Sequence, residues 1–333
     1  MKQILSLFLL AAIVGSTAAQ PARRDERRTR STGNRFQATD VAYPSEFTTR
    51  VEGAYRVITA NGIPDHQTGQ FPNRGNPHSI APQDYRYRIP AQPKPARTTT
   101  PLGMHPFGIA VNGVVFDPRA AEWWNGARNS IWQYEPLTSS MTLGADMNDA
   151  HVQPSGAYHY HGVPAALLKK KTGGSPKMIL LGWAADGFPI YGPHGLKDPA
   201  NSGSGLKRVR SSYQLRKGRR PSGSQGPGGN YDGSFTADWV YVKGSGDLDE
   251  CNGRFGVTPD FPSGIYHYYL TEEFPFVPRR FRGTPDQGFM RHGGPGGRGF
   301  GGPPGGRGFG GPPSRGGGPR GNRRPGGAPP RPR

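Results

Sequence analysis

The chain has 333 residues, a formal net charge of +19, a mean hydropathy of -0.69, 52 Gly, 36 Pro and a single cysteine. So much Gly and Pro excludes a chain that packs along its whole length, and a lone Cys251 excludes an internal disulfide framework. The charge would suggest nucleic acid, but residues 20–35 carry +4, residues 291–333 carry +9 and Lys2 carries +1, which leaves +5 for residues 36–290. The basicity therefore belongs mainly to the ends of the chain.

The N-terminus predicts export. Lys2 precedes an apolar run at residues 4–14 and small residues at 17–19, the pattern of a secretory signal peptide over residues 1–19. That run is too short to span a bilayer stably, and no later stretch approaches membrane length. We expect a mature protein that is secreted or located in the periplasm or cell envelope, without a membrane span. Residues 20–40 are polar and aperiodic and predict a disordered basic leader.

Short strand-like runs with turn residues between them follow. Residues 41–100 predict an N-terminal β segment, in which Asn61-Gly62 after a strand at 54–60 indicates a hairpin turn. A second such dipeptide, Asn112-Gly113, lies between β-branched flanks and again predicts a hairpin.

The main domain is expected over residues 101–287. It contains two short helix candidates, at 118–126 and 164–171, and a Gly/Ser-rich surface-loop insertion at 201–230. The predicted fold is mainly β, a compact sandwich- or barrel-like domain of short strands with a few short helices. Residues 288–333 repeat Gly-Gly-Pro and Gly-Gly-Arg-Gly-Phe and predict a disordered Gly/Pro/Arg-rich tail.

Three of the nine histidines, His151, His159 and His161, lie within eleven residues. If the stretch Tyr-His-Tyr-His at 158–161 is extended, both tyrosines lie on one face and both imidazoles on the other, roughly 6.6 Å apart at the backbone. One metal ion can accept both imidazoles. The alternative is that the two histidines form ordinary hydrogen bonds inside a β core that the tyrosines fill.

A second stretch repeats this motif. Residues 154–161 read Pro-Ser-Gly-Ala-Tyr-His-Tyr-His, and residues 262–269 read Pro-Ser-Gly-Ile-Tyr-His-Tyr-Tyr. We therefore expect two related hairpins that face each other in one domain. The copies differ, because Tyr269 replaces the second histidine and Arg254 stands roughly where His151 does. Two identical metal sites are not expected.

These motifs, with Asp-Gly-Phe-Pro-Ile-Tyr-Gly at 186–192 and Leu-Asp-Glu-Cys-Asn-Gly-Arg at 248–254, resemble the YHYH-domain family of exported bacterial proteins. The resemblance covers roughly residues 100–283. It implies metal binding by the histidines that give the family its name, and it implies no established activity.

The predicted metal ligands are His159 and His161 from one strand, His151 from the preceding turn, and a fourth from His267 or His194. Imidazoles without thiolates suit zinc or copper. Three ligands and an open position would allow Lewis-acid catalysis, whereas a closed set would be structural. His267 and His194 could equally be histidines without a ligand role.

Groups next to these histidines are expected to support them. Asp149 could orient an imidazole by accepting its N–H, which ligating histidines commonly need. Tyr158 and Tyr160 would support the same strand from its other face.

Two further groups have alternative roles. Asp186, directly before a glycine, is typical of a turn rather than of an acid/base catalyst. Cys251 with Met104 or Met178 as axial ligand would suit a copper electron-transfer site, but lone cysteines are usually buried and inert.

Three functions follow from these patterns. The first is an exported protein that binds a metal ion through its histidine cluster. The second is a non-enzymatic envelope or extracellular module anchored by its basic tail to an anionic polymer, since export disfavours nucleic acid as the partner of the Arg/Gly tail. The third is a metal-dependent hydrolase or oxidase.

Overall fold

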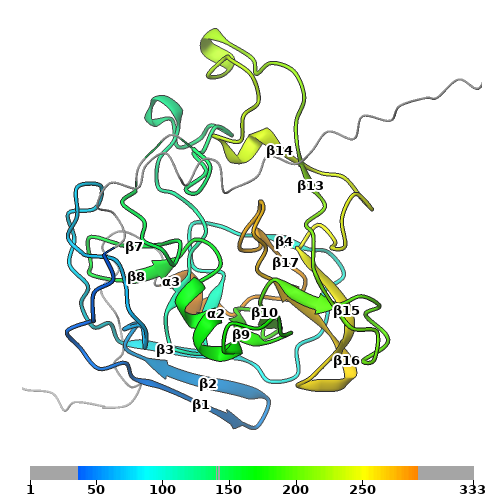
Figure 1. Cartoon of the computed structure of the whole chain (residues 1–333). Coiled ribbons are helices and arrows are strands. Elements are labelled where there is room, and N and C mark those ends of the chain that lie inside the picture. The colour runs from blue at the N-terminus through cyan, green and yellow to red at the C-terminus, as the bar shows by residue number, and fades with distance from the viewer. Residues whose placement is uncertain (1–36, 140, 142, 292–333) are drawn as a thin grey trace, which may run out of the picture. The chain divides into compact units, whose positions relative to one another are not determined.

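The computed structural model describes residues 37–139, 141 and 143–291. The predicted signal peptide, most of the basic leader and nearly all of the tail lie outside the described residues. Short strands dominate (Figure 1), which confirms the mainly β prediction. The helical elements are α2 (Ala165–Thr172), α3 (Gln287–Arg291) and the 3-10 turns η2 (Trp124–Gly126), η3 (Gly223–Gln225) and η4 (Thr236–Asp238). Among the described residues, no helix combines the length and apolarity that crossing a membrane requires.

An eight-stranded sheet forms the centre of the domain, with the strand order β15-β16-β10-β9-β5-β6-β8-β7. Its strands are β5 (Gly108–Ala110), β6 (Val115–Phe116), β7 (Ala150–Val152), β8 (Tyr158–Tyr160), β9 (Leu180–Ala184), β10 (Pro189–Tyr191), β15 (Gly253–Thr258) and β16 (Phe261–Tyr269). The pairs β6–β8 and β10–β16 are parallel, and the other neighbours are antiparallel.

Smaller sheets surround this one. They are β1 (Phe47–Glu52), β2 (Tyr55–Ala60) and β3 (Tyr85–Pro90); β4 (Thr100–Pro101) with β17 (Arg280–Phe281); β11 (His194–Leu196) with β12 (Leu206–Arg208); and β13 (Tyr213–Leu215) with β14 (Trp239–Tyr241). The three-stranded sheet packs on the central one: Ile58 and Tyr87 share a buried core with Ile109, and the Arg56 guanidinium lies 3.8 Å from the centre of the Trp183 ring. The predicted loop at 201–230 contains β12, β13 and η3.

The hairpin predicted at Asn61-Gly62 is wrong. β2 pairs with β1 through a turn at Gly53, and a long connection leads from Asn61 to β3. The Asn61 side chain instead donates to the Pro44 carbonyl at 2.8 Å and accepts the Glu46 N–H at 3.1 Å. The Asn112-Gly113 hairpin is confirmed by the pairing of β5 with β6.

The central sheet consists of two halves with the same strand order and directions. The first half is β5-β6-β8-β7 and the second half is β9-β10-β16-β15. In each half, a hairpin leads through a long connection to a second hairpin, whose later strand carries Tyr-His-Tyr. The two motif strands are thus related, but the expectation that their hairpins face each other is wrong, because four strands separate β8 from β16.

The two halves meet at β5 and β9 through a symmetric register. Ile109 pairs with Trp183, while Gly108 pairs with Ala184 and Ala110 with Gly182. A pseudo-twofold axis therefore passes through the Ile109–Trp183 pair, perpendicular to the sheet. Only glycine fits at the two flanking positions: a Cβ on Gly108 would lie 2.3 Å from the Trp183 carbonyl oxygen, and one on Gly182 would lie 2.5 Å from that of Ile109.

Hydrogen bonds repeat in the two halves. The Tyr158 hydroxyl donates to Asp146 at 2.7 Å in the first half, as the Tyr266 hydroxyl donates to Asp249 at 3.0 Å in the second. Tyr160 is hydrogen-bonded to Asn112 at 3.0 Å, as Tyr268 is to Asp186 at 2.5 Å. The His161 N–H donates to the Asp149 carbonyl at 2.7 Å, as the Tyr269 N–H donates to the Asn252 carbonyl at 3.0 Å. Asp186 also lies in the β9–β10 turn, as predicted. Duplication therefore extends from the topology to side-chain contacts.

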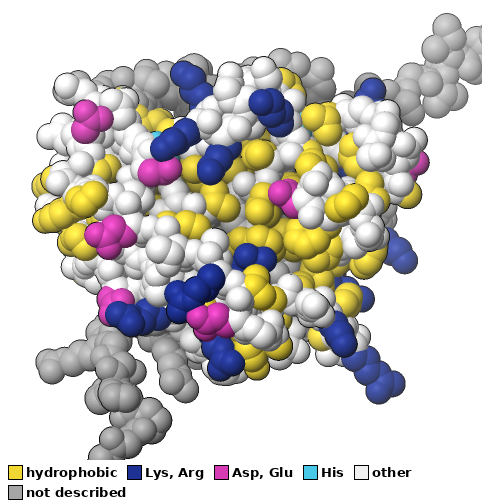
Figure 2. All heavy atoms as spheres, turned by 90° about the horizontal axis from the view of Figure 1, so that it is seen from below, with side chains coloured by type: hydrophobic (Ala, Val, Ile, Leu, Met, Phe, Trp, Pro, Cys, Tyr) yellow, Lys and Arg dark blue, Asp and Glu magenta, His cyan; other side chains and the backbone are white. Residues whose placement is uncertain are grey.

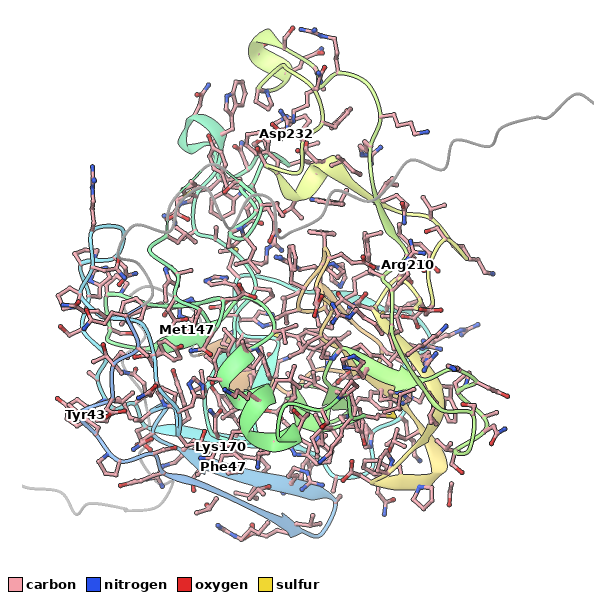
Figure 3. All side chains as sticks on the ribbon, viewed as in Figure 1. Tyr43, Phe47, Met147, Lys170, Arg210 and Asp232 are labelled. Carbon is pink, nitrogen blue, oxygen red and sulfur yellow. The ribbon has the colours of Figure 1, made fainter. Side chains whose placement is uncertain are left out.

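Charged side chains are dispersed over the face shown in Figure 2, where Lys and Arg alternate with Asp, Glu and hydrophobic groups. Figure 3 labels Lys170 on α2, whose Nζ binds the Asp65 carboxylate at 2.8 Å. This mixture agrees with the small net charge of residues 36–290.

Candidate metal centre

β7 and β8 place two histidines side by side. His151 pairs directly with His159 in their antiparallel register, and directly paired residues project to the same face of a sheet. His151 therefore belongs to a strand, and its predicted position in a turn is wrong. The connection between the strands is closed by the Gly156 N–H, which donates to the Gln153 carbonyl at 2.8 Å.

His161 joins them from the residue after β8. Its N–H donates to the Asp149 carbonyl at 2.7 Å, which extends the hairpin pairing, so that His161 projects to the same face as His159 two residues earlier. Met147, labelled in Figure 3, lies in the turn that leads into β7. The ring centres of the three histidines lie 4.5, 4.8 and 4.7 Å apart.

The three side chains can converge on one ion. One nitrogen from each ring lies within 4.8 Å of the other two, so some point lies within about 2.8 Å of all three, whereas histidine–zinc bonds measure about 2.0–2.1 Å. Side-chain shifts of under about 1 Å close this difference. In the part of the chain that the structure describes, this is the one group of three or more His, Cys, Asp or Glu with such geometry.

Main-chain carbonyls orient two of the rings. Nδ1 of His151 lies 2.9 Å from the Leu143 carbonyl, and Nδ1 of His159 lies 3.2 Å from the Ala157 carbonyl. Nδ1 of His151 also lies 3.2 Å from the Asn76 amide nitrogen, but its shorter contact is to the carbonyl. A carbonyl only accepts hydrogen bonds, so the proton is assigned to each Nδ1, and each Nε2 keeps a lone pair for a ligand role. Neither carbonyl can be identified from the sequence.

His161 is the innermost member. It is 1 % exposed, and neither of its ring nitrogens makes a hydrogen bond of standard geometry among the described residues, although the Pro118 carbonyl lies close enough to counteract part of the lowering of its pKa. Leaving a buried polar group unsatisfied costs about 1–3 kcal/mol. A metal ion would satisfy one of these nitrogens.

All three imidazoles are neutral near pH 7. Burial, with the nearby charge of His159 and His78, lowers the pKa of His151 to about 3, and burial lowers that of His159 to about 4. Burial and the two neighbouring imidazoles hold the pKa of His161 well below its usual value. Neutral imidazole is the form that binds metals.

The tyrosines of the motif support the strand from its other face. The Tyr158 hydroxyl donates to Asp146 at 2.7 Å. The Tyr160 hydroxyl lies 2.6 Å from Nε2 of His66 and accepts from Asn112. The sequence argument did not single out these three partners, although Asp146 could have been found, because Asp249 holds the equivalent place before the second motif.

Asp149 contributes through its main chain. Its carbonyl accepts the His161 N–H, and its φ of +53° is matched by +56° at the equivalent Asn252, a left-handed conformation that Asp and Asn adopt more readily than most residues. Its carboxylate lies against Gly162, where a Cβ would be 2.6 Å from Oδ2.

The other predicted ligands lie elsewhere. His267 is on β16, five strand spacings from β8, or roughly 24 Å at about 4.8 Å per spacing. His194 begins β11. Cys251 is fully buried before β15, and burial with the charges of Asp249 and Glu250 raises the pKa of its thiol. The structure thus brings together three of the five predicted histidines.

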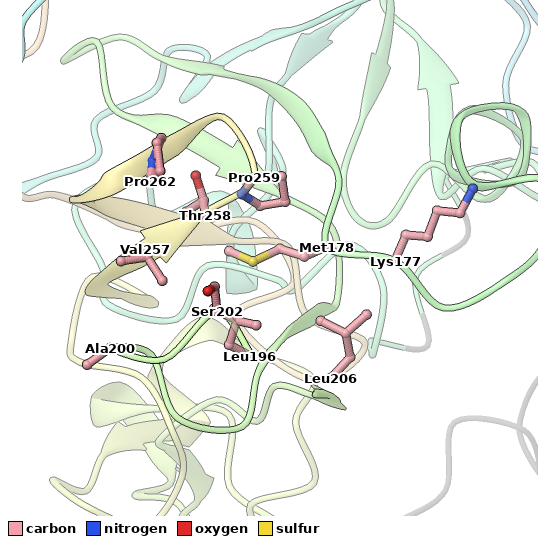
Figure 4. Close-up of a pocket in the computed structure, with 10 residues that line it drawn as sticks. All are labelled: Lys177, Met178, Leu196, Ala200, Ser202, Leu206, Val257, Thr258, Pro259 and Pro262. Carbon is pink, nitrogen blue, oxygen red and sulfur yellow. The ribbon is translucent and has the colours of Figure 1, made fainter. Parts of the chain in front are cut away.

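A pocket of about 660 Å³ lies beside the second half rather than at the histidines (Figure 4). Its lining is Lys177, Met178, Leu196, Ala200, Ser202, Leu206, Val257, Thr258, Pro259 and Pro262. This lining contains no imidazole, thiolate or carboxylate, so the pocket lacks the strongest protein ligands for a metal.

Comparison with known proteins agrees with the motif. The model of a family described as YHYH protein matches residues 86–283, more than half of the chain, including all three clustered histidines and both motif strands. Neither curated proteins nor solved structures yield a match.

Proposed function

The chain belongs to the YHYH protein family, and from that premise we propose that it is an exported protein that binds a metal ion through His151, His159 and His161. The observation that carries the proposal is the approach of one nitrogen from each ring to within 4.8 Å of the others in a buried, neutral cluster. Two buried imidazoles and a half-buried one lie against one another with both nitrogens of His161 unpaired among the described residues, an uncommon way to fill a core, since buried polar groups are normally hydrogen-bonded.

The donor set favours zinc or copper. Both ions accept neutral imidazole nitrogen, and neither requires the carboxylates that Mg²⁺ and Ca²⁺ prefer. Metal-binding histidines usually donate the N–H of their second ring nitrogen to a carbonyl or carboxylate. The Nδ1 atoms of His151 and His159 make such hydrogen bonds to main-chain carbonyls.

A second candidate function, metal-assisted hydrolysis or oxidation, is favoured by the number of ligands. Three protein ligands leave a fourth tetrahedral position for a small molecule, as in catalytic zinc sites. A metal there would supply Lewis-acid chemistry.

Elemental analysis of protein purified from its native compartment tests the main proposal. About one zinc or copper ion per chain is expected, with loss of the ion in His159→Ala and His161→Ala. His267→Ala is the matched control, because it removes a buried histidine from the equivalent strand and should leave the metal content unchanged. Absence of stoichiometric metal in the wild type, or unchanged content in the first two variants, would overturn the proposal.

Export and the role of the basic tail are part of the same proposal. Residues 1–19 have the composition of a signal peptide, and residues 291–333 carry nine Arg and no acidic residue. We expect cleavage after Ala19, seen by mass spectrometry of the mature chain. A chain ending at residue 290 should leave a heparin column at lower salt than the full chain, because charge attraction to an anionic polymer is screened by salt. Equal elution of the two chains would exclude this role for the tail.

A further inference from the structure

The second half of the sheet carries Arg254, His267 and Tyr269 at the positions equivalent to the three clustered histidines. We infer that Arg254 and Tyr269 keep this half free of metal, because the Arg254 guanidinium supplies the positive charge that an ion supplies in the first half. Changing both positions to histidine should therefore create a second metal site. The inference rests on the proposed function of the first half.

The equivalence of the positions follows from the strand register. Arg254 pairs with His267 as His151 pairs with His159. The rings of His267 and Tyr269 lie 5.0 Å apart at 61°, against 4.7 Å and 65° for His159 and His161. The second half thus presents its side chains in nearly the geometry of the first.

The orientation of the central histidine is also repeated. Nδ1 of His267 lies 2.9 Å from the Ile265 carbonyl, two residues earlier in the chain. That bond places the proton on Nδ1 and leaves Nε2 as an acceptor, as in His159. In both halves, a main-chain carbonyl therefore fixes the tautomer of the central histidine, so that its Nε2 is an acceptor.

In the second half this imidazole is already satisfied. Nε2 of His267 lies 2.9 Å from the Tyr269 hydroxyl, which donates to it. The same hydroxyl accepts from Nη2 of Arg254 at 3.3 Å. The three groups form a continuous chain of donors and acceptors, whereas neither ring nitrogen of His161 makes a hydrogen bond of standard geometry among the described residues.

The guanidinium is held in place from the opposite side. Nη2 of Arg254 donates to the Leu196 carbonyl at 2.6 Å, and its central carbon lies 5.3 Å from the centre of the Tyr269 ring. β11 closes over the group: a Cβ on Gly195 would lie 2.4 Å from the Tyr269 hydroxyl and 2.9 Å from Nη2 of Arg254. Repulsion between like charges would oppose the entry of a metal ion beside this cation.

Zinc titration of purified metal-free protein tests the inference. The wild type should bind one Zn²⁺ and R254H/Y269H should bind two. R254Q/Y269F is the matched control, because it removes the same charge and hydroxyl without adding a ligand, and it should bind one. The double change is also placed in an H159A/H161A background, where the created set is the one three-histidine cluster left among the residues that the structure describes, and one Zn²⁺ is expected.

The outcomes separate the inference from the proposed function. If R254H/Y269H melts cooperatively but binds no more zinc than R254Q/Y269F, the inference is overturned while wild-type binding still supports the first site. If the wild type binds no zinc, the first site is refuted and the H159A/H161A background alone decides the second. If the double variant does not fold, R254H alone, which offers two imidazoles and the Tyr269 phenol, must bind more Co²⁺ than R254Q, and equal binding overturns the inference.

Discussion

His159 and His267 each hold Nδ1 against the carbonyl two residues earlier, Ala157 at 3.2 Å and Ile265 at 2.9 Å, in equivalent strands of the two sheet halves. The same support leads to different chemistry. His159 lies beside two other imidazoles, whereas His267 is hydrogen-bonded to a phenol. The strand orients the imidazole in the same way in both halves, and only the neighbouring side chains differ.

Bound metal should stabilise the protein. Because a ligand that binds only the folded state adds RT ln(1 + [L]/Kd), free metal at 100 times Kd adds about 2.7 kcal/mol. Thermal melts with and without Zn²⁺ should show this gain in the wild type and in H267A but not in H161A. An equal gain in H161A would contradict the three-histidine site.

The duplicated tyrosine–aspartate bonds should have similar energies. Y158F removes the hydroxyl that donates to buried Asp146, and Y266F removes the one that donates to Asp249. Each change should lower the free energy of unfolding by about 1–3 kcal/mol, because a buried acceptor loses a donor.

Urea unfolding of the two single variants and of Y158F/Y266F measures these losses. The two sites lie in separate halves and share no partner, so the losses should add within about 0.5 kcal/mol. A larger interaction energy would show that the halves are coupled through more than β5 and β9.

The glycines beside the pseudo-twofold axis should not tolerate a side chain. G108A and G182A each place a Cβ within 2.5 Å of a carbonyl oxygen, and strand shifts to relieve this should cost about 1–3 kcal/mol or more. G203A is the control, since its Cβ meets nothing closer than 3.4 Å. Chemical denaturation of the three variants compares them, and an unaffected G108A would argue against the β5–β9 register.

Lowering the pH should reduce the free energy of unfolding because His267 is buried as a neutral imidazole. Burial, with a contribution from the Arg254 charge, lowers its pKa in the folded state to about 4, while the unfolded value is about 6.5. The unfolded state therefore binds the proton first as pH falls, and the contribution of neutral His267 to stability is full above pH 6.5 and lost toward pH 4.

In H267Q this loss is absent. Between pH 7 and pH 4 the free energy of unfolding should fall by about 3 kcal/mol more in the wild type than in H267Q. Metal-free protein is used, so that changes in metal binding do not enter. Parallel curves for the two proteins would show that His267 titrates normally.

Local features of the sequence predicted much of the site. Alternation in Tyr-His-Tyr-His placed His159 and His161 on one face, and the Pro-Ser-Gly-x-Tyr-His-Tyr echo indicated the duplication. Comparison of the two motifs also showed that Tyr269 replaces the second histidine and that Arg254 stands roughly where His151 does. Strand alternation has a period of two residues and the duplication repeats the same letters, so both can be read directly from the sequence.

Other features depend on contacts between distant segments. His151 was predicted in the turn before the motif strand, but pairing with β8 makes it a strand residue. The order of the eight strands and the Leu143 carbonyl behind His151 have no local signature. Likewise, Asn112-Gly113 forms a hairpin while Asn61-Gly62 does not, because the Asn61 side chain is engaged by the segment at Pro44 and Glu46.

The seam between β5 and β9 has a consequence for the origin of the domain. Gly-Ile-Ala on one strand lies opposite Gly-Trp-Ala on the other, with each glycine facing an alanine. Either edge could therefore pair with a second copy of itself, as the isologous contact of a homodimer does. The covalent segment from His161 to Ile179 makes that pairing intramolecular, so that it no longer depends on protein concentration. In such an arrangement the sheet needs both halves, whereas the proposed metal site needs the side chains of only one.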